Sequence, residues 1–196
     1  MSVTVIILCG GTSARMGGVD KTAMDLDGRS VLDRIVVDLP DDWPIVCVGE
    51  PRPLSRDVTW TREDPPLGGP VAGLAAGLAA GPDSDVIVTL AGDQPFAGPT
   101  AVACAESLRG AQLGPDIDGV AARQDDGHPQ ALLAAYRREP FARAVSAADP
   151  GSGVYRTLSR LEVLTLDSDT RATLDVDTPA DLDDARSTIR DADASG

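Results

Sequence analysis

The sequence predicts an α/β domain, a three-layer Rossmann-like fold in which helices cover a mostly parallel central sheet. Apolar runs typical of strands alternate along the chain with longer segments of helical period, which favours a parallel sheet. The runs at 3–9 and 85–91 are apolar almost throughout, as in strands that are buried on both faces. With 196 residues, 42% of them hydrophobic, the chain can form one core. We expect a single domain over 1–190 and a frayed tail over 191–196.

Seven strands and six helices follow from this pattern. The expected strands lie at 3–9, 45–49, 58–61, 85–91, 119–122, 131–136 and 161–166. Helices are expected where apolar residues recur on one helical face. The expected helices lie at 30–39, 69–81, 99–109, 138–148, 152–160 and 179–190. Ligands of such folds bind beyond the carboxyl ends of the strands, so functional residues are expected there.

Two of the helices carry specific sequence signals. The helix at 69–81 has Pro70 at its first position, where a missing N–H does no harm. Gly73 and Gly77 are four residues apart and share one face of that helix, which we expect to pack closely against the sheet. The helix at 179–190 follows "DTP", a capping residue and a proline.

The balance of charge excludes some classes of partner. Asp and Glu number 31 against 17 Lys and Arg, which gives a net charge of −14. Such a field repels nucleic acid and anionic membranes, so neither is an expected partner. Three cysteines without metal-ligand spacing indicate reduced thiols, and the first apolar run is too short for a membrane span. We therefore expect a cytoplasmic protein, and a monomer because of its small size and short loops.

The segment "GGTSARMGGVDK" follows the first expected strand. It fits neither the dinucleotide-binding pattern G-x-G-x-x-G nor the Walker A pattern. The amides of Gly10 and Gly11 can form an anion-binding nest, because glycine allows a phosphate to approach the backbone. Arg15 offers a forked donor and Lys21 a point charge. The segment predicts a phosphate-binding loop, and the alternative is a glycine-rich turn with surface cations.

Carboxylates stand where they could hold a metal ion. Asp93 follows the buried strand at 85–91, and Mg²⁺ prefers one or two carboxylates together with phosphate oxygens. Asp175 and Asp177 alternate in "LDVDTPADL", so on an extended segment both point to one side and could complete the site. The alternative is that Asp93 caps a turn or helix and that Asp177 caps the last helix.

Two further segments offer weaker signals. "REDPPLGGPVAGL" is a stiff loop before a helix N-terminus, and its Asp64 could accept the paired N–H donors of a guanine edge. The only histidine, His128, lies in "DGHPQALLAAY", where either a functional role or an ordinary turn is possible.

Taken together, these segments resemble the molybdenum cofactor guanylyltransferases, the MobA-like nucleotidyltransferases. That family opens with L-A-G-G-x-S-x-R-M-G-x-x-K, which is matched from Leu8 to Lys21. Similar segments follow in order as "EDPPLGGPVAGL", "AGDQPF", "HPQALLAAYRR" and "LDVDTPADL". The resemblance covers nearly the whole chain. It implies a nucleotidyltransferase that uses GTP and Mg²⁺ to attach GMP to the terminal phosphate of molybdopterin carrying molybdenum, releasing pyrophosphate.

The resemblance also implies roles for residues on the nucleotide side. Nucleotide contacts are implied for Leu8, Cys9, Gly10, Gly11, Lys21, Asp64 and Asp93. Arg15, Lys21 and Asp93 would be the catalytic residues, with the two cations on the phosphates. Asp93 would hold Mg²⁺, and Asp177 would be a further ligand. The attacking phosphate is already anionic at neutral pH, so no strong general base is needed.

On the other side of the site, the resemblance implies contacts with the pterin substrate. His128, Gln130 and Asp175 would lie there. Transient contact with molybdoenzymes or their chaperones is also implied.

Two alternative functions stay open. Asp175 and Asp177 stand where guanylyltransferases commonly carry asparagines. Aspartates at these positions resemble those of the cytidylyltransferases of the same superfamily. This alternative implies an enzyme that uses CTP on this cofactor or on a sugar-like phosphate. A non-catalytic carrier of the nucleotide or cofactor is the other alternative. The presence of Asp93 together with Arg15 and Lys21 argues against a carrier, because a protein that only binds the nucleotide hardly requires a metal ligand such as Asp93.

Overall fold

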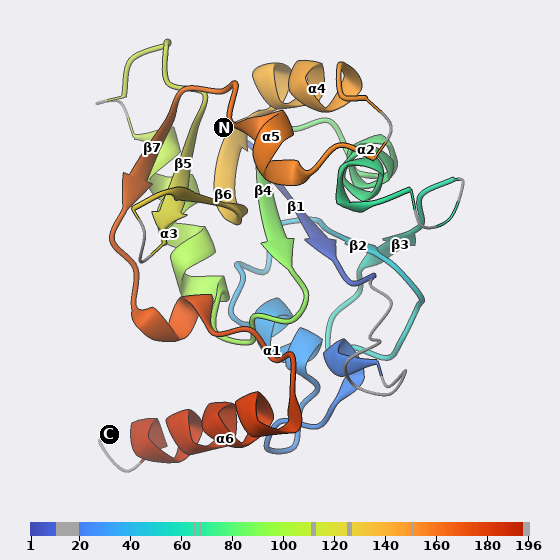
Figure 1. Cartoon of the computed structure of the whole chain (residues 1–196), viewed down its shortest axis with the longest axis vertical. Coiled ribbons are helices and arrows are strands. Elements are labelled where there is room, and N and C mark those ends of the chain that lie inside the picture. Colours follow the sequence, from blue (N-terminus) through green and yellow to red (C-terminus); the bar gives the residue numbers. More distant parts are fainter. Residues whose placement is uncertain are drawn as a thin grey trace.

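Seven strands form one sheet in the computed structural model, which describes residues 1–10, 20–64, 66, 68–110, 113–124, 127–149 and 151–193. Each lies where the sequence predicts a strand, with ends that differ by up to two residues. The strands are β1 (Val3–Leu8), β2 (Ile45–Val48), β3 (Thr59–Thr61), β4 (Val86–Ala91), β5 (Gly119–Arg123), β6 (Pro129–Arg137) and β7 (Val163–Leu166). Figure 1 shows this sheet between two groups of helices. The predicted three-layer α/β fold is confirmed.

The sheet is mostly parallel, also as predicted. Its strand order is β3-β2-β1-β4-β6-β5-β7, and β6 runs antiparallel to both of its neighbours. The ladder between β5 and β6 shifts its register, because Ala121 pairs with Ala134 whereas Arg123 pairs with Pro129. Extra residues of β6 therefore bulge where this strand enters the sheet. The bulge brings the start of β6 to Pro129, two residues earlier than the predicted segment at 131–136.

Helices cover both faces of the sheet (Figure 1). They are α1 (Val31–Val37), α2 (Pro70–Ala80), α3 (Gly98–Arg109), α4 (Arg138–Ser146), α5 (Val154–Leu158) and α6 (Pro179–Asp193), with short 3-10 helices η2 (Lys21–Ala23) and η3 (Thr170–Thr173). Buried side chains of α1 and α3 form one core with the sheet, and those of α2, α4 and α5 form another. In the described part of the chain, none of these helices combines the length and apolar character needed to cross a membrane.

The close packing predicted for α2 is confirmed. A Cβ on Gly77 would lie 2.5 Å from Ile6 Cγ2, and one on Gly73 would lie 3.1 Å from Leu8 Cδ2. The two glycines thus allow α2 to approach β1 more closely than residues with side chains would permit.

The structure differs from the predicted elements mainly at helix ends. The predicted helix at 152–160 is reduced to α5, while α6 continues to Asp193, three residues into the expected tail. Arg190 in the last turn of α6 suits the negative end of the helix dipole, and Ile189 packs against a small core that includes Leu26 and Leu182. Both 3-10 helices are too short to show a period in the sequence.

Candidate active site

The carboxyl ends of β1, β2 and β4 lie side by side. The backbone N–H of Cys9 donates to Val48 O at 2.9 Å, and that of Gly92 donates to Leu8 O at 2.9 Å. A Cβ on Gly92 would lie only 3.0 Å from Leu8 O, so glycine suits this close approach. As a result, the chain turns directly against the end of β1 and brings Asp93 beside the start of the glycine-rich segment.

The first predicted nucleotide contacts lie at this edge. Leu8 is half-buried, Cys9 is buried and Gly10 is exposed, whereas Gly11 and Arg15 lie outside the described residues. A hydrogen bond with the thiol of Cys47, together with burial, raises the pKa of Cys9 well above its ordinary value. Cys9 therefore stays a protonated thiol that packs in the core, and only its backbone is suited to meet a ligand.

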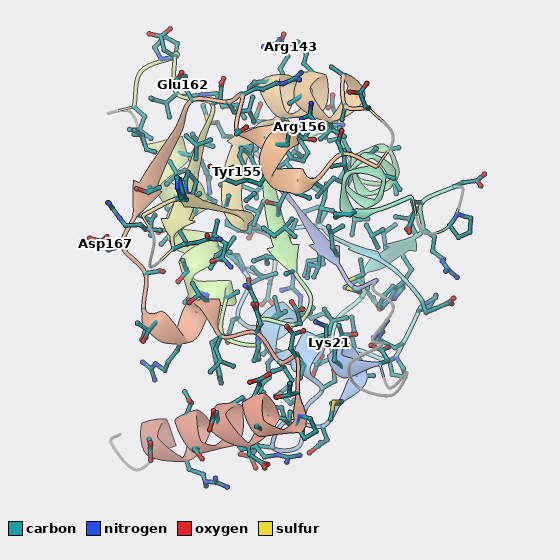
Figure 2. All side chains as sticks on the ribbon, in the orientation of Figure 1. Lys21, Arg143, Tyr155, Arg156, Glu162 and Asp167 are labelled. Atoms are coloured by element: carbon teal, nitrogen blue, oxygen red, sulfur yellow. The ribbon has the colours of Figure 1, made fainter. Side chains whose placement is uncertain are left out.

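Lys21 lies between two carboxylates that come from distant parts of the chain. Its Nζ donates to Asp93 Oδ2, and it donates to Asp177 Oδ1 at 2.6 Å. Lys21 belongs to η2, Asp93 follows β4 and Asp177 precedes α6. Figure 2 shows Lys21 at the end of the sheet toward which the arrows of β1 and β4 point. We call Lys21, Asp93 and Asp177 the Lys21 cluster, and it unites three of the predicted site residues.

Lys21 carries a positive charge in the cluster. Desolvation opposes the charged form of Lys21, but hydrogen bonds with Asp177 and Asp93 raise its pKa above the ordinary value. About a fifth of the side chain is exposed for Lys21 (21%) and for Asp93 (20%), so solvent screens this pair only in part. Lys21 is also the only lysine in the sequence. The site thus holds a permanent, partly shielded ammonium group.

Asp175 and Asp177 lie in the segment that passes the turn after β4, and their carboxylates contact Gln94 and Lys21, respectively. Between them Val176 is buried, and its N–H donates to Asp93 O at 2.9 Å. Gln94 Nε2 donates to Asp175 Oδ1 at 2.7 Å. Desolvation and the nearby carboxylates of Asp93 and Asp177 raise the pKa of Asp175, against the effect of the Gln94 hydrogen bond. The segment before α6 is therefore fixed to the turn after β4 through both backbone and side chains.

The alternative that Asp177 caps α6 is not what the structure shows. The Asp181 N–H donates to Thr178 Oγ1 at 3.3 Å, and Asp181 Oδ2 accepts from the Thr178 N–H at 2.7 Å. This reciprocal capping box is formed by Thr178 and Asp181, whereas the carboxylate of Asp177 reaches Lys21. Asp93 is likewise not the cap of α3, which follows Ala97.

Asp64 lies apart from the Lys21 cluster. It is exposed after β3 and lines an open groove of about 520 Å³ between the end of β3 and the outer alanines of α2. Lys21, Asp93 and Asp177 do not line this groove. Asp64, the predicted base-reading residue, therefore lies on the β1 side of the sheet, but it does not contact the Lys21 cluster.

His128 and Gln130 lie at the entry of β6, on the far side of β4 from β1. The His128 ring meets Tyr155 of α5 edge-on, with ring centroids 6.0 Å apart. Tyr155 also lines a cavity of about 180 Å³ together with residues of β6 and β7. Gln130 Oε1 is buried and has no hydrogen-bond partner among the described residues. Tyr155 could not be singled out from the sequence, because a single aromatic residue in a five-residue helix carries no motif.

Arg52, in the loop after β2, is another residue that no sequence pattern indicates. Its guanidinium donates to Asp20 Oδ2 and to Thr22 Oγ1, which flank Lys21 on both sides. The segment "EPRPLSR" around Arg52 shows no period, and the contact partner at Asp20 is 32 positions away. A link of this kind becomes visible only when the loops are in place.

Three solved structures are similar to this chain over nearly its whole length. Molybdopterin-guanine dinucleotide biosynthesis protein A from Archaeoglobus fulgidus is 21% identical, with a TM-score of 0.68, covering 96% of this chain and 99% of that one. A nucleotidyl transferase from Methanothermobacter thermautotroptrophicus is 16% identical, with a TM-score of 0.74 and coverage of 97% and 99%. The 2-C-methyl-D-erythritol 4-phosphate cytidylyltransferase from Thermus thermophilus is 13% identical, with a TM-score of 0.68 and coverage of 94% and 98%. At these identities the likeness establishes the fold.

The family is established by the sequence itself. Comparison with curated proteins finds no match. The model of the MobA-like NTP transferase domain, however, matches residues 5–164, which include Lys21, Asp93 and His128. This match covers most of the chain and agrees with the fold of the three structures. The chain therefore belongs to the family of MobA-like NTP transferase domains and is a nucleotidyltransferase.

Proposed function

We propose that this nucleotidyltransferase transfers GMP from GTP to the terminal phosphate of molybdopterin carrying molybdenum, and releases pyrophosphate. The observation that carries the proposal is the Lys21 cluster, because it unites the ends of three segments that resemble the guanylyltransferases. The segment "GPVAGL" at the start of α2 supports the choice of GTP. The name of the Archaeoglobus fulgidus protein, which refers to molybdopterin-guanine dinucleotide biosynthesis, supports the same substrates.

The proposed reaction is an in-line displacement at phosphorus. A phosphate oxygen of the acceptor forms a bond to the α-phosphorus of GTP. The bond from that phosphorus to the oxygen bridging to the β-phosphate breaks, and pyrophosphate leaves with the electron pair. The attacking oxygen is already anionic, so catalysis depends on positioning and on neutralising negative charge. In our proposal Lys21 and Arg15 neutralise the phosphates, and the amides of Gly10 and Gly11 fix their position.

The donor set of the Lys21 cluster fits Mg²⁺. Asp93 and Asp177 bring two carboxylates to one ammonium group, and Mg²⁺ in nucleotide sites binds one or two carboxylates together with substrate phosphates. Among the described residues, no group of three or more His, Cys, Asp or Glu side chains could hold a metal ion. Asp93 and Asp177 would therefore share the ion with the nucleotide. When bound, it would neutralise charge on the phosphates, and Lys21 would be free to contact a phosphate.

We assign the acceptor to the β6 side of the site. In the sheet, β4 with Asp93 at its end separates β1 from β6. A nucleotide held by the loops after β1 would bring its phosphates to Asp93 and leave the β6 entry open. There, Tyr155 and the cavity that it lines with Pro129 and Ala131 offer an aromatic and apolar surface, which suits a flat heterocycle such as a pterin.

Transfer of CMP from CTP is the second candidate. The observation that favours it is the pair of carboxylates Asp175 and Asp177, which contact Gln94 and Lys21 at the site. Asp64 would then have no role in reading the base.

Pyrophosphate release tests the proposal. The purified protein is given molybdenum-carrying molybdopterin, Mg²⁺ and one of GTP, CTP, ATP or UTP, and pyrophosphate is measured. Among the four nucleotides, we expect only GTP to give pyrophosphate release. Release with CTP and none of the others would establish the second candidate. Thermal unfolding with each nucleotide runs in parallel, because a ligand at about 100 times its Kd stabilises by about 2.7 kcal/mol. Stabilisation by GTP without any pyrophosphate release would contradict the enzymatic proposal and indicate a carrier.

A further inference from the structure

Arg52 connects two loops and one strand in the nucleotide half of the site. Its Nη1 donates to Asp20 Oδ2 and Thr22 Oγ1, while its Nε and Nη2 donate to Glu50 O at 3.2 and 3.1 Å. Its guanidinium carbon lies 5.6 Å from the centre of the Trp60 ring. The Arg52 side chain is only 10% exposed. A single buried guanidinium thus contacts the chain after β1, the chain after β2, and β3 itself.

The Asp20 contact bears directly on Lys21. Asp20 is the N-cap of η2, and its Oδ1 accepts from the Thr22 N–H at 3.1 Å and from Thr22 Oγ1 at 2.7 Å. Desolvation acts against the charged form, but hydrogen bonds from Thr22 and Arg52 hold the pKa of Asp20 below its ordinary value. Asp20 is therefore ionised, and Arg52 and Thr22 fix the carboxylate that begins the turn carrying Lys21.

We propose that Arg52 is a positioning residue for the nucleotide phosphates. It holds the Asp20 cap so that Lys21 of η2 points toward Asp93, and it ties this cap to the β3 side of the sheet through Glu50 and Trp60. The inference rests on the proposed function in one respect, namely that phosphates bind at the Lys21 cluster. Nothing in it depends on which base or acceptor is used.

The chemistry of the contacts explains why an arginine is needed. One side chain must donate to a carboxylate and a hydroxyl on one edge, donate twice to a carbonyl on another edge, and lie over an aromatic ring. The planar fork of arginine does this, whereas the ammonium of lysine is a compact point charge. Arg52→Lys should therefore behave like Arg52→Met for the position of Lys21, although it keeps the charge.

Arg56 in the same loop is a matched control. Its side chain is also largely buried, at 18% exposed. Its guanidinium donates to backbone carbonyls at the end of α1 and in the connection to β2, and its Nε lies 4.0 Å from Asp41 Oδ1. The carbonyls are those of Val36, Leu39, Pro40, Asp41 and Trp43. Arg56→Met removes a similar buried arginine without touching η2, so it reports the purely structural cost.

The first test needs no nucleotide. Because Lys21 is the only lysine, isotope-labelled lysine gives one side-chain ammonium signal in an NMR spectrum. We expect Arg52→Met and Arg52→Lys to shift or broaden this signal and to speed amide hydrogen exchange over residues 20–23, whereas Arg56→Met should leave both unchanged. An unaltered Lys21 signal in Arg52→Met would overturn the proposal, whatever the enzyme's substrate.

The second test uses the nucleotide that the wild-type protein binds. Misplacing a reacting group by about 1 Å can reduce the rate about 10²-fold, so kcat/KM of Arg52→Met should fall by up to that factor while Arg56→Met stays near wild type. Asp20→Asn in the Arg52→Met background should add little further loss, because both changes break the same link. Independent, additive losses would show that Arg52 does not act through Asp20. If no nucleotide binds the wild type, the proposed function fails while the NMR result still decides this inference.

Discussion

Lys21 and Asp177 are 156 positions apart in the sequence, yet Lys21 Nζ donates to Asp177 Oδ1 at 2.6 Å. The contact joins the turn after the glycine-rich segment to the segment just before α6. Asp93, at the end of the central strand β4, contacts the same ammonium group. Segments from the first and the last parts of the chain therefore meet at the carboxyl edge of the sheet, and the charge of the site depends on all three residues.

Replacing Lys21 by methionine should reduce turnover by about 10²–10³, the usual loss when one preorganised donor is removed from a site of developing charge. The change keeps the apolar stem and removes only the ammonium. Steady-state pyrophosphate release measures the effect. Arg143→Met is the control, because it removes a cation from an exposed ion pair with Glu139 on α4. Turnover within a few-fold of wild type for Lys21→Met would rule out a catalytic ammonium.

Asp93→Asn should remove the dependence of the rate on Mg²⁺ concentration, because an amide oxygen is a much poorer ligand than a carboxylate. The fold should change little, since the backbone carbonyl of Asp93 still accepts from the Val176 N–H. Asp83→Asn is the control, since Asp83 forms an exposed ion pair with Arg138. If the rate of Asp93→Asn still rises with Mg²⁺ as in wild type, the metal ligands lie elsewhere.

Gly77→Val should destabilise the protein by about 1–3 kcal/mol or more, because overpacking a full core forces the backbone to shift. A Cβ alone would lie 2.5 Å from Ile6 Cγ2, and valine adds two methyl groups. Ala75→Val on the exposed face of α2 is the control, and helix propensity limits its loss to about 0.7 kcal/mol. Urea unfolding compares the two, and equal losses would show that α2 does not pack tightly on β1.

Asp175→Asn should increase stability at neutral pH. Desolvation raises the pKa of Asp175 above its value of 3.8 in the unfolded chain, so its charge is disfavoured in the folded state at pH 7. As the pH falls through the folded pKa, the wild-type carboxyl is protonated and this penalty disappears. The free-energy difference between variant and wild type should therefore shrink toward about pH 4. A difference that is independent of pH, or grows in acid, would contradict the assigned pKa direction.

The sequence predicts the sheet well because the evidence for a strand is local. Runs such as Val86–Ala91 are apolar almost throughout, and Gly73 with Gly77 shows which face of α2 lies on β1. No local sequence signal of this kind indicates the direction of β6. Its apolar residues would suit either direction, and the short connection after Arg123 makes it antiparallel to β5.

The site could be predicted only in part. Lys21, Asp93 and Asp177 carry recognisable motifs, but their contact depends on how the chain passes from β7 to α6 across the edge of the sheet. The choice between a metal ligand and a helix cap for Asp177 depended on Thr178 and Asp181, which form the cap together. Arg52 belongs to no motif, and its importance comes entirely from two loops and strand β3, which meet in space.

The central claim is that nucleotide phosphates and Mg²⁺ bind at the Lys21 cluster, and the single lysine signal tests it most directly. Wild-type protein with isotope-labelled lysine is titrated with GTP in the presence and absence of Mg²⁺. We expect a saturable change in the Lys21 ammonium signal that requires both ligands for its full size and that Asp93→Asn weakens. Binding of GTP and Mg²⁺ by calorimetry with no change in this signal would place the nucleotide elsewhere and contradict the account.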